Sequence, residues 1–376
     1  MEQSLLILFW KIGRGIIRNG NYQNFASIVG GGTSGAGGSA SNTTKYRLII
    51  ESGYYNSTAL VNGTSGSANY VEMKGIYGND LDRVKENNNN LDVYYCAGGG
   101  WGGNINSTTT TTTAVSLIVK SGSFGSGKYD YTTGIYVGGR SGGTHNAIRA
   151  ITVEGGYIYN LIGGPLSGNN RSELNDILMS IKGGSIDMII GGAGLTATYG
   201  NRIIQITGGT INYSVFGGSN GYGGGSSDGT LNGSTYLYVG GDSIIGSEDN
   251  VNNNRTLFGS EAGSVFGIGN GRTEYGTIGS CDNSYIILDG DTTIKRNVYG
   301  GGNYGATGVS STKSTTETKI DIHGGNVIGS IFGGGNRNGS GSSSKSSTIN
   351  ITMTDGIVSG NVCLYKQRRA LFFVSG

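Results

Sequence analysis

The chain has 376 residues, including 75 glycines and one proline, and its 26 basic and 24 acidic side chains leave a formal net charge of +2. So small a charge provides no strong field to attract nucleic acid or an acidic membrane, and the scattered Lys and Arg residues agree with this. The 23 tyrosines and the recurrent valine and isoleucine argue against disorder, because disordered chains are usually poor in aromatic and β-branched residues.

The sequence shows no sign of membrane insertion, and no stretch approaches the roughly 18 apolar residues of a membrane span. The apolar run 5–10 follows Glu2 and is shorter than the roughly 7–15 residues of a signal-peptide core, so no export signal is recognisable. Three distant cysteines, Cys96, Cys281 and Cys363, fit neither a fully paired disulfide framework nor a zinc site. We expect them to be buried as small apolar residues, and the sequence does not assign them a role.

Residues 1–14 carry no repeat and are expected to be an N-terminal cap or an artefactual start. Over residues 15–363, short alternating apolar segments each precede a glycine-containing corner, and period-two alternation predicts strands. In chain order, the apolar pairs expected to face the core are Leu48 and Ile50, Leu117 and Val119, Ile151 and Val153, Met179 and Ile181, Ile204 and Ile206, Tyr236 and Tyr238, Tyr285 and Ile287, Ile320 and Ile322, and Ile351 and Met353. The copy at Tyr236 is less regular, because Leu237 and Val239 lie out of its frame.

Most of these copies are 25 to 35 residues apart. The step from Ser52 to Ser121 is about twice as long, and the segment 71–75 is a candidate degenerate copy within it. Insertions are expected near residues 76–92 and 247–280.

A second half follows each glycine corner, as in GGTINYSVFGG, where Ile211, Val215 and Phe216 precede another glycine pair. In three copies an asparagine stands three residues after the first of these later glycines, at Asn220, Asn303 and Asn336. Such asparagines either stack as a hydrogen-bonded ladder or reflect the ordinary preference of asparagine for turns.

Units of this size cannot bury an apolar face alone, and stacking supplies the core. Glycine suits the corners because a positive φ carries no Cβ penalty there, and the scarcity of proline leaves the strand N–H groups available. We therefore predict an all-β parallel β-solenoid, expected to be a right-handed β-helix, of about ten irregular 25–35-residue coils. The alternative is an antiparallel propeller or sandwich, because glycine pairs also occur in hairpins.

The repeated GG-x-[IV]-x(3)-[VI]-[FY]-GGG-N pattern resembles the glycine-rich repeats of large adhesin-like surface proteins of gut bacteria and related anaerobes. The similarity covers about residues 15–363. It implies extracellular or cell-surface display, a β-helical stalk and a role in attachment, and it supplies no catalytic residues. The chain departs from that family in showing neither an export signal nor a cell-wall sorting motif.

The repeat already runs at Gly15 and stops at Cys363, after which residues 364–376 have no repeat character. We hypothesise that the chain is an internal piece of a longer protein, with a tail produced by a frameshift or by the choice of gene boundaries. The alternative is that both ends are genuine caps, which solenoids need.

The residue types of common catalytic and cofactor sites do not converge in this sequence. The glycine-rich runs at Gly191 and Gly333 lack the GK[ST] and helix of a phosphate loop, and most glycine corners lack the aspartate of calcium-binding nonapeptides. The close acidic pairs, Asp80 with Asp82 and Glu248 with Asp249, lie in expected insertions. We therefore predict no catalytic, cofactor-binding or metal-binding residues.

The remaining candidates are isolated side chains. His145 and His323 are far apart in sequence, and alternation places His323 on the surface beside Ile322. The threonine run 108–113 occurs once and is expected to be a polar loop. Trp101 and several tyrosines could stack on a sugar, although singly exposed aromatics are common; these tyrosines are Tyr54, Tyr55, Tyr222 and Tyr304.

Two functions remain open. The first is a noncatalytic structural or adhesive module of a secreted or cell-surface bacterial protein, with glycans or the proteins of host or neighbouring cells as partners. The alternative is a carbohydrate-active β-helix enzyme, such as a polysaccharide lyase or hydrolase, which would bring several carboxylates together in one groove. The sequence gives neither the ligand nor the oligomeric state.

Overall fold

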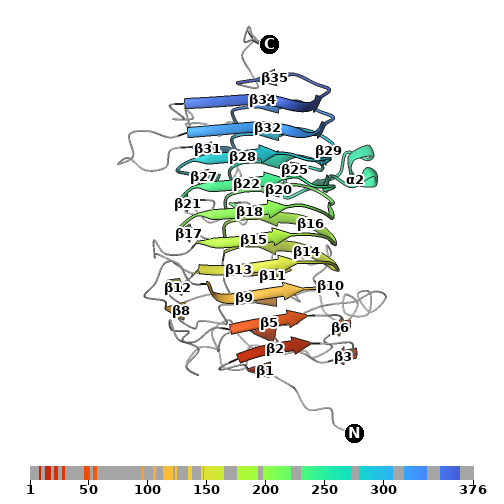
Figure 1. Cartoon of the computed structure of the whole chain (residues 1–376), viewed down its shortest axis with the longest axis vertical. Helices are drawn as coiled ribbons and strands as arrows, with labels where there is room; N and C mark the ends of the chain where they lie inside the picture. The colour runs from red at the N-terminus through yellow and green to blue at the C-terminus, as the bar shows by residue number, and fades with distance from the viewer. Residues whose placement is uncertain are drawn as a thin grey trace.

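A computed structural model shows the chain as one tall stack of parallel coils (Figure 1). Side chains are described within residues 117–121, 134–137, 149–164, 176–193, 198–221, 230–271, 280–304, 317–336 and 348–364. Outside these ranges only strand segments are described.

The first strands of successive coils pair in parallel and in chain order to form one continuous side of the stack, which we call the front face (Figure 1). Ten described strands build it: β2 (Gly13–Ile17), β5 (Tyr46–Ile50), β9 (Thr113–Val119), β13 (Ile148–Val153), β15 (Ile177–Ile181), β18 (Arg202–Ile206), β22 (Thr235–Val239), β28 (Ser284–Leu288), β32 (Glu317–Val327) and β34 (Thr348–Val358). The predicted parallel solenoid of about ten coils is therefore confirmed, and the antiparallel alternative is wrong.

The second halves of the coils stack in the same way and complete the large sheet. Their strands are β7 (Tyr95–Cys96), β10 (Ser123–Phe124), β11 (Ile135–Tyr136), β14 (Tyr157–Ile162), β16 (Ser185–Ile190), β19 (Thr210–Ile211), β20 (Val215–Phe216), β23 (Ile244–Ile245), β26 (Val265–Phe266), β29 (Thr293–Ile294), β30 (Val298–Tyr299), β33 (Ile331–Phe332) and β35 (Val362–Cys363).

Shorter pairs of strands join segments outside the large sheet. The parallel pairs are β1 (Leu8–Phe9) with β4 (Ile28–Val29), β3 (Asn21–Gln23) with β6 (Tyr54–Asn56), β8 (Ile105–Asn106) with β12 (His145–Asn146), β17 (Thr198–Tyr199) with β21 (Leu231–Asn232), and β27 (Gly279–Cys281) with β31 (Gly305–Thr307).

The core fills the inside of the stack with columns of aliphatic side chains, one residue from each coil. On the front face, five of the predicted pairs face inward, and each of their members is at most 2% exposed. In the last described coil Ile351 packs against the core, whereas Met353 is 45% exposed. The side chains of Leu48 and Ile50 lie outside the described ranges. The inward column at the first position of each pair runs Leu117, Ile151, Met179, Ile204, Leu237, Ile286, Ile320 and Ile351. Burial of these columns supplies the main stabilisation.

Two of the predicted pairs are wrong. In β22 the inward residues are Leu237 and Val239, and Tyr236 and Tyr238 point outward. In β28 the same holds for Ile286 and Leu288, with Tyr285 and Ile287 outward.

The physical reason lies in the corner that follows each strand. At most corners the glycine with positive φ comes three residues after the last core residue, as Gly209 follows Ile206. In these two coils it comes after only two residues, at Gly241 (φ 60°) and Gly290 (φ 61°). Counting the alternation back from the glycine therefore misplaces the inward positions of these two strands by one residue. A shift of one residue exchanges the inward and outward side chains of a whole strand.

Two expectations about irregular coils can be compared with the sheet. Strand β9 pairs directly with β5, so these two described strands are neighbours on the front face despite the long step between them. The candidate copy at residues 71–75 and the expected insertion near residues 76–92 lie outside the described residues. Within residues 247–280, helix α2 (Glu248–Asn252) and the antiparallel hairpin β24 (Thr256–Leu257) and β25 (Ser260–Glu261) project from the stack (Figure 1). Strand β26 then returns to the large sheet.

The asparagines form a hydrogen-bonded ladder, which is one of the two alternatives that the sequence left open. Asn270 donates to Asn220 at 3.2 Å, Asn303 to Asn270 at 2.9 Å, and Asn336 to Asn303 at 3.1 Å. Asn270 was missed because Ile268 interrupts its glycine pair. The ladder runs near a stack of aromatic rings, Phe216, Phe266, Tyr299 and Phe332, whose centroids are 4.7 to 5.2 Å apart.

Candidate ligand-binding site

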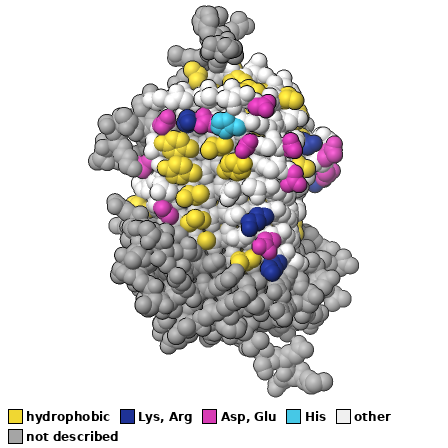
Figure 2. All heavy atoms as spheres, in the orientation of Figure 1, with side chains coloured by type: hydrophobic (Ala, Val, Ile, Leu, Met, Phe, Trp, Pro, Cys, Tyr) yellow, Lys and Arg dark blue, Asp and Glu magenta, His cyan; other side chains and the backbone are white. Residues whose placement is uncertain are grey.

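An exposed group of aromatic and aliphatic side chains lies on the outer side of the front face (Figure 2). We call it the aromatic patch, and it consists of Ile203, Gln205, Tyr236, Tyr238, Tyr285 and Ile287. Tyr236 is 41% exposed, Ile203 40% and Ile287 37%. These are large fractions for apolar side chains that lie next to one another on one surface.

Parallel register brings the six residues together from three coils. One outward column runs Ile203, Tyr236 and Tyr285, and the second runs Gln205, Tyr238 and Ile287. Adjacent strands are about 4.8 Å apart, so three strands span about 10 Å along the axis. The patch exists because the corners at Gly241 and Gly290 turn the tyrosines outward.

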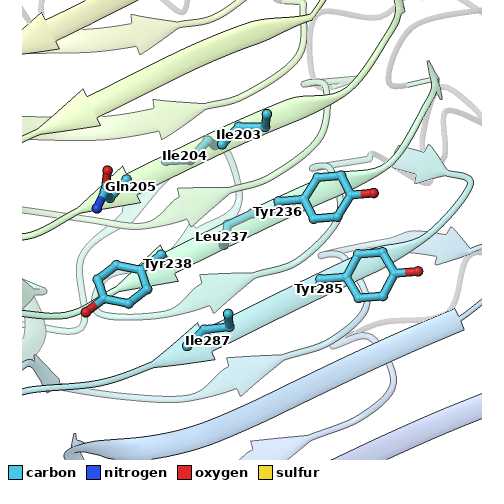
Figure 3. A pocket seen from close by; sticks show the side chains of 8 residues that line it. All are labelled: Ile203, Ile204, Gln205, Tyr236, Leu237, Tyr238, Tyr285 and Ile287. Atoms are coloured by element: carbon cyan, nitrogen blue, oxygen red, sulfur yellow. The ribbon is translucent and has the colours of Figure 1, made fainter.

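The two rings of the first column overlap. The centroids of Tyr236 and Tyr285 are 5.0 Å apart, and their planes are inclined by 13°. Aromatic rings prefer an offset stack to a full sandwich, and Figure 3 shows both rings lying over β22 and β28 with part of each face turned outward. Each hydroxyl lies at the free end of its ring.

A shallow groove of about 220 Å³ follows the patch. Its lining consists of the six patch residues together with Ile204 and Leu237, which lie between them on the same strands (Figure 3). None of the eight lining residues carries a charge at neutral pH, so the groove is an apolar surface with hydroxyl and amide groups at its edge.

Carboxylates border the groove and fix two of its hydroxyls. Tyr238 donates its hydroxyl to Asp289 Oδ2 at 3.0 Å, and Tyr285 donates to Glu317 Oε2 at 3.2 Å. Glu317 also accepts from Asn350 Nδ2 at 3.2 Å, and Asp289 Oδ1 accepts from the backbone N–H of Gly290 at 2.8 Å.

These bonds shift the pKa of the groups involved. The Gly290 N–H and then the Tyr238 hydroxyl lower the pKa of Asp289. The bond to Asp289 raises the pKa of Tyr238, and burial followed by the charge of Glu317 raises that of Tyr285. Both phenols are therefore protonated at neutral pH and act as hydrogen-bond donors.

Strand β32 supplies the remaining polar border. Lys319 Nζ lies 2.6 Å from Asp321 Oδ2, and the exposed His323 contacts the hydroxyl of Thr354 through Nδ1 at 2.9 Å. His323 is thus on the surface, as alternation predicted. Figure 2 shows this charged row beside the apolar patch.

A second polar cluster lies on the neighbouring side of the coils. Asp187 accepts from Tyr157 at 2.9 Å and from Asn212 at 2.6 Å, and burial raises its pKa. Asn212 in turn accepts from Asn250 of helix α2 at 3.2 Å. The cluster attaches the α2 excursion to the stack, and we assign it a structural role.

Other candidates from the sequence are separate from the patch. Glu248 and Asp249 lie on α2, where Asp249 pairs with Arg255 at 3.1 Å on an exposed surface. Tyr304 is half-buried with a φ of 56°. The structure describes no side chain for the others: Tyr54, Tyr55, Asp80, Asp82, Trp101, Tyr222, His145 and the threonine run 108–113.

The patch residues were missed by reading the sequence, although a signal was present. Both TYLYVGG and SYIILDG contain apolar residues in either frame of alternation, so one frame had to place apolar side chains outside. The number of residues between the strand and the glycine with positive φ decides which set of alternating side chains faces the core. This number is known only once the coils are stacked.

Within the described ranges, no three His, Cys, Asp or Glu side chains converge as a metal site, and no helix there is long and apolar enough to cross a membrane. Cys281 is fully buried and Cys363 partly buried, and burial raises the pKa of the Cys281 thiol. Comparisons with protein-family models, curated proteins and solved structures give no match to this chain.

Proposed function

We propose that the chain is a noncatalytic structural and adhesive module of a secreted or cell-surface bacterial protein. The aromatic patch is the observation that carries the proposal. Its three most exposed apolar residues, Ile203, Tyr236 and Ile287, form a contiguous surface on a regular sheet, and such surfaces mark interaction sites. A stiff stack of coils is suited to holding that surface at a distance from an anchor.

The groove chemistry supports binding without turnover. Bond cleavage in a polysaccharide needs a carboxylate pair or a strong base at the scissile bond. The described groove is lined by aliphatic, phenolic and amide side chains. The bordering acids Asp289, Glu317 and Asp321 each already bind a group of this chain.

Attachment and turnover can be measured on the same protein. Beads coated with the full chain should remain on surfaces coated with host or plant polysaccharides under flow that removes albumin-coated beads. Incubation of the soluble chain with the same polysaccharides should release no new reducing ends and no unsaturated products.

Either result can contradict the proposal. Beads that detach as readily as the albumin control would remove the adhesive role. Released products would favour the alternative, a carbohydrate-active enzyme, and Asp289, Glu317 and Asp321 would then be the first side chains to replace.

A further inference from the structure

The aromatic patch has the size and shape of a sugar-binding surface. A stable protein interface usually involves about 20–30 residues on each side, whereas the patch contains six and its groove holds about 220 Å³. The strands beneath it are paired on both sides, so they offer no free edge for an added peptide strand. A small, rigid ligand fits these limits better than a folded partner.

The ring geometry indicates what part of that ligand is apolar. A pyranose ring presents C–H groups on its face, and such a face packs against an aromatic ring. Tyr236 and Tyr285 follow one another along the solenoid axis with centroids 5.0 Å apart, and Ile203 extends the same column. Successive ring-sized units of a chain that runs along the axis would therefore meet successive apolar side chains.

The border indicates the polar part. A sugar hydroxyl both donates and accepts, and an ionised carboxylate has more acceptor positions than one bond occupies. Glu317 and Asp289 each accept two hydrogen bonds from this chain, one of them from a tyrosine hydroxyl, out of the roughly four acceptor positions of a carboxylate. Gln205 offers an amide donor and acceptor on the neighbouring strand β18, beside Tyr238 (Figure 3).

Charge narrows the ligand class. The groove lining is uncharged. The border combines the three acids Asp289, Glu317 and Asp321 with Lys319 and the exposed His323. This border is acidic and would repel uronic or sialic acids. A neutral sugar chain, which offers only hydroxyl groups, is not repelled by these carboxylates.

We propose that the aromatic patch binds a neutral polysaccharide chain lying along the solenoid axis, with sugar faces on Tyr236 and Tyr285 and hydroxyls on the carboxylate border. This inference rests on the proposed adhesive function and assigns its ligand class and its contact residues.

The test uses the full-length chain on an array of neutral glucans, mannans, xylans and galactans printed beside polygalacturonate and sialylated glycans. Affinity for the strongest soluble neutral polysaccharide is then measured by calorimetry for the wild type and for Tyr236→Ala and Tyr285→Ala. Ile244→Ala is the matched control, because Ile244 is a similarly exposed apolar residue (37%) in the same coil but on the next side. Circular dichroism checks that each variant keeps its sheet.

We expect binding to neutral polysaccharides, a loss of at least about tenfold in affinity in each tyrosine variant, and an unchanged affinity in Ile244→Ala. Tyr236→Phe keeps the ring and should bind within about twofold of the wild type. Because phenylalanine preserves the packing of the ring, this variant remains informative if the alanine substitutions disturb the local fold.

Several results would overturn the inference. Unchanged binding in both alanine variants would show that the ligand binds outside the patch. The adhesive function would still stand in that case if the coated beads remain attached. Binding only to acidic glycans would contradict the charge argument. Self-association in sedimentation that disappears in the tyrosine variants, without glycan binding, would identify the patch as a contact between copies. The absence of both glycan binding and self-association would overturn the inference as well.

Discussion

Tyr236 and Tyr285 are 49 positions apart in the sequence, yet they are direct partners in parallel register and their rings overlap with centroids 5.0 Å apart. The excursion that contains α2 and the β24–β25 hairpin leaves the stack between them without disturbing this register. The site therefore depends on coil stacking across an insertion.

The overlap of these rings should be measurable as a coupling energy. Aromatic pairs contribute about 0.5–1.5 kcal/mol beyond the area that they bury. A double-mutant cycle with Tyr236→Leu and Tyr285→Leu, followed by urea denaturation, should give a coupling in that range. Additive effects of the two substitutions would show that the rings contribute only their separate burial.

The corner at Gly241 should tolerate no side chain. Its φ is 60°, and an added Cβ would lie 2.1 Å from the carbonyl oxygen of Thr207. Gly241→Ala should lower the free energy of unfolding by more than the about 1–2 kcal/mol that the left-handed conformation alone costs. The exposed neighbour Asp242 provides the control, and Asp242→Ala should leave the urea midpoint nearly unchanged. Equal midpoints for both variants would contradict the close packing of the corner.

The asparagine ladder should be weaker at its described end than in its interior. Asn270 is fully buried, accepts from Asn303, and donates to Asn220 and to the carbonyl of Phe258 at 2.9 Å. Asn270→Ala should cost about 1–3 kcal/mol, because buried groups lose their partners. Asn336→Ala, at a half-buried rung, should cost less in the same thermal-melt comparison. The reverse order would mean that the ladder bonds do not control stability.

Arg202 should be important for stability although it lies inside the fold. Its side chain is fully buried and donates to the carbonyls of Tyr199, Gly200 and Asn201 at 3.0 to 3.1 Å, and burial lowers its pKa to about 9. Arg202→Met should cost at least about 2 kcal/mol, since these carbonyls lose their donor.

Arg255→Met is the matched control for this substitution. Arg255 forms an exposed ion pair with Asp249, and such pairs contribute about 0–1 kcal/mol. Chemical denaturation of both variants measures the difference. Similar losses would show that the buried carbonyls find other donors.

Asp187 should make stability depend on pH. Burial raises its pKa in the folded state above the ordinary value of about 3.9. Its contribution is therefore complete below the unfolded pKa and is lost as the pH rises through the raised folded pKa. Melting temperatures of the wild type should fall relative to Asp187→Asn as the pH rises from about 4 toward neutrality. A constant difference between the two proteins across this range would contradict the shift.

The sequence by itself determined the class of fold. Alternation before a glycine corner is a local pattern, and it predicted the stacked coils and inward pairs such as Ile204 with Ile206. It also located three of the four described ladder asparagines, but left open whether they form a ladder or serve turns. These features follow from short segments whose side chains and turns are fixed by neighbouring residues.

Only the tertiary structure decided which sides of β22 and β28 are exposed. Counting alternate residues back from the glycines wrongly predicted Tyr236 and Tyr285 to lie in the core. The alternating pattern does not show how many residues each corner contains. Stacking against Ile204 and Ile320 selects the other frame, in which Leu237 and Ile286 continue the aliphatic column. The aromatic patch is the consequence, since its members come from three coils and meet only through the register of the stack.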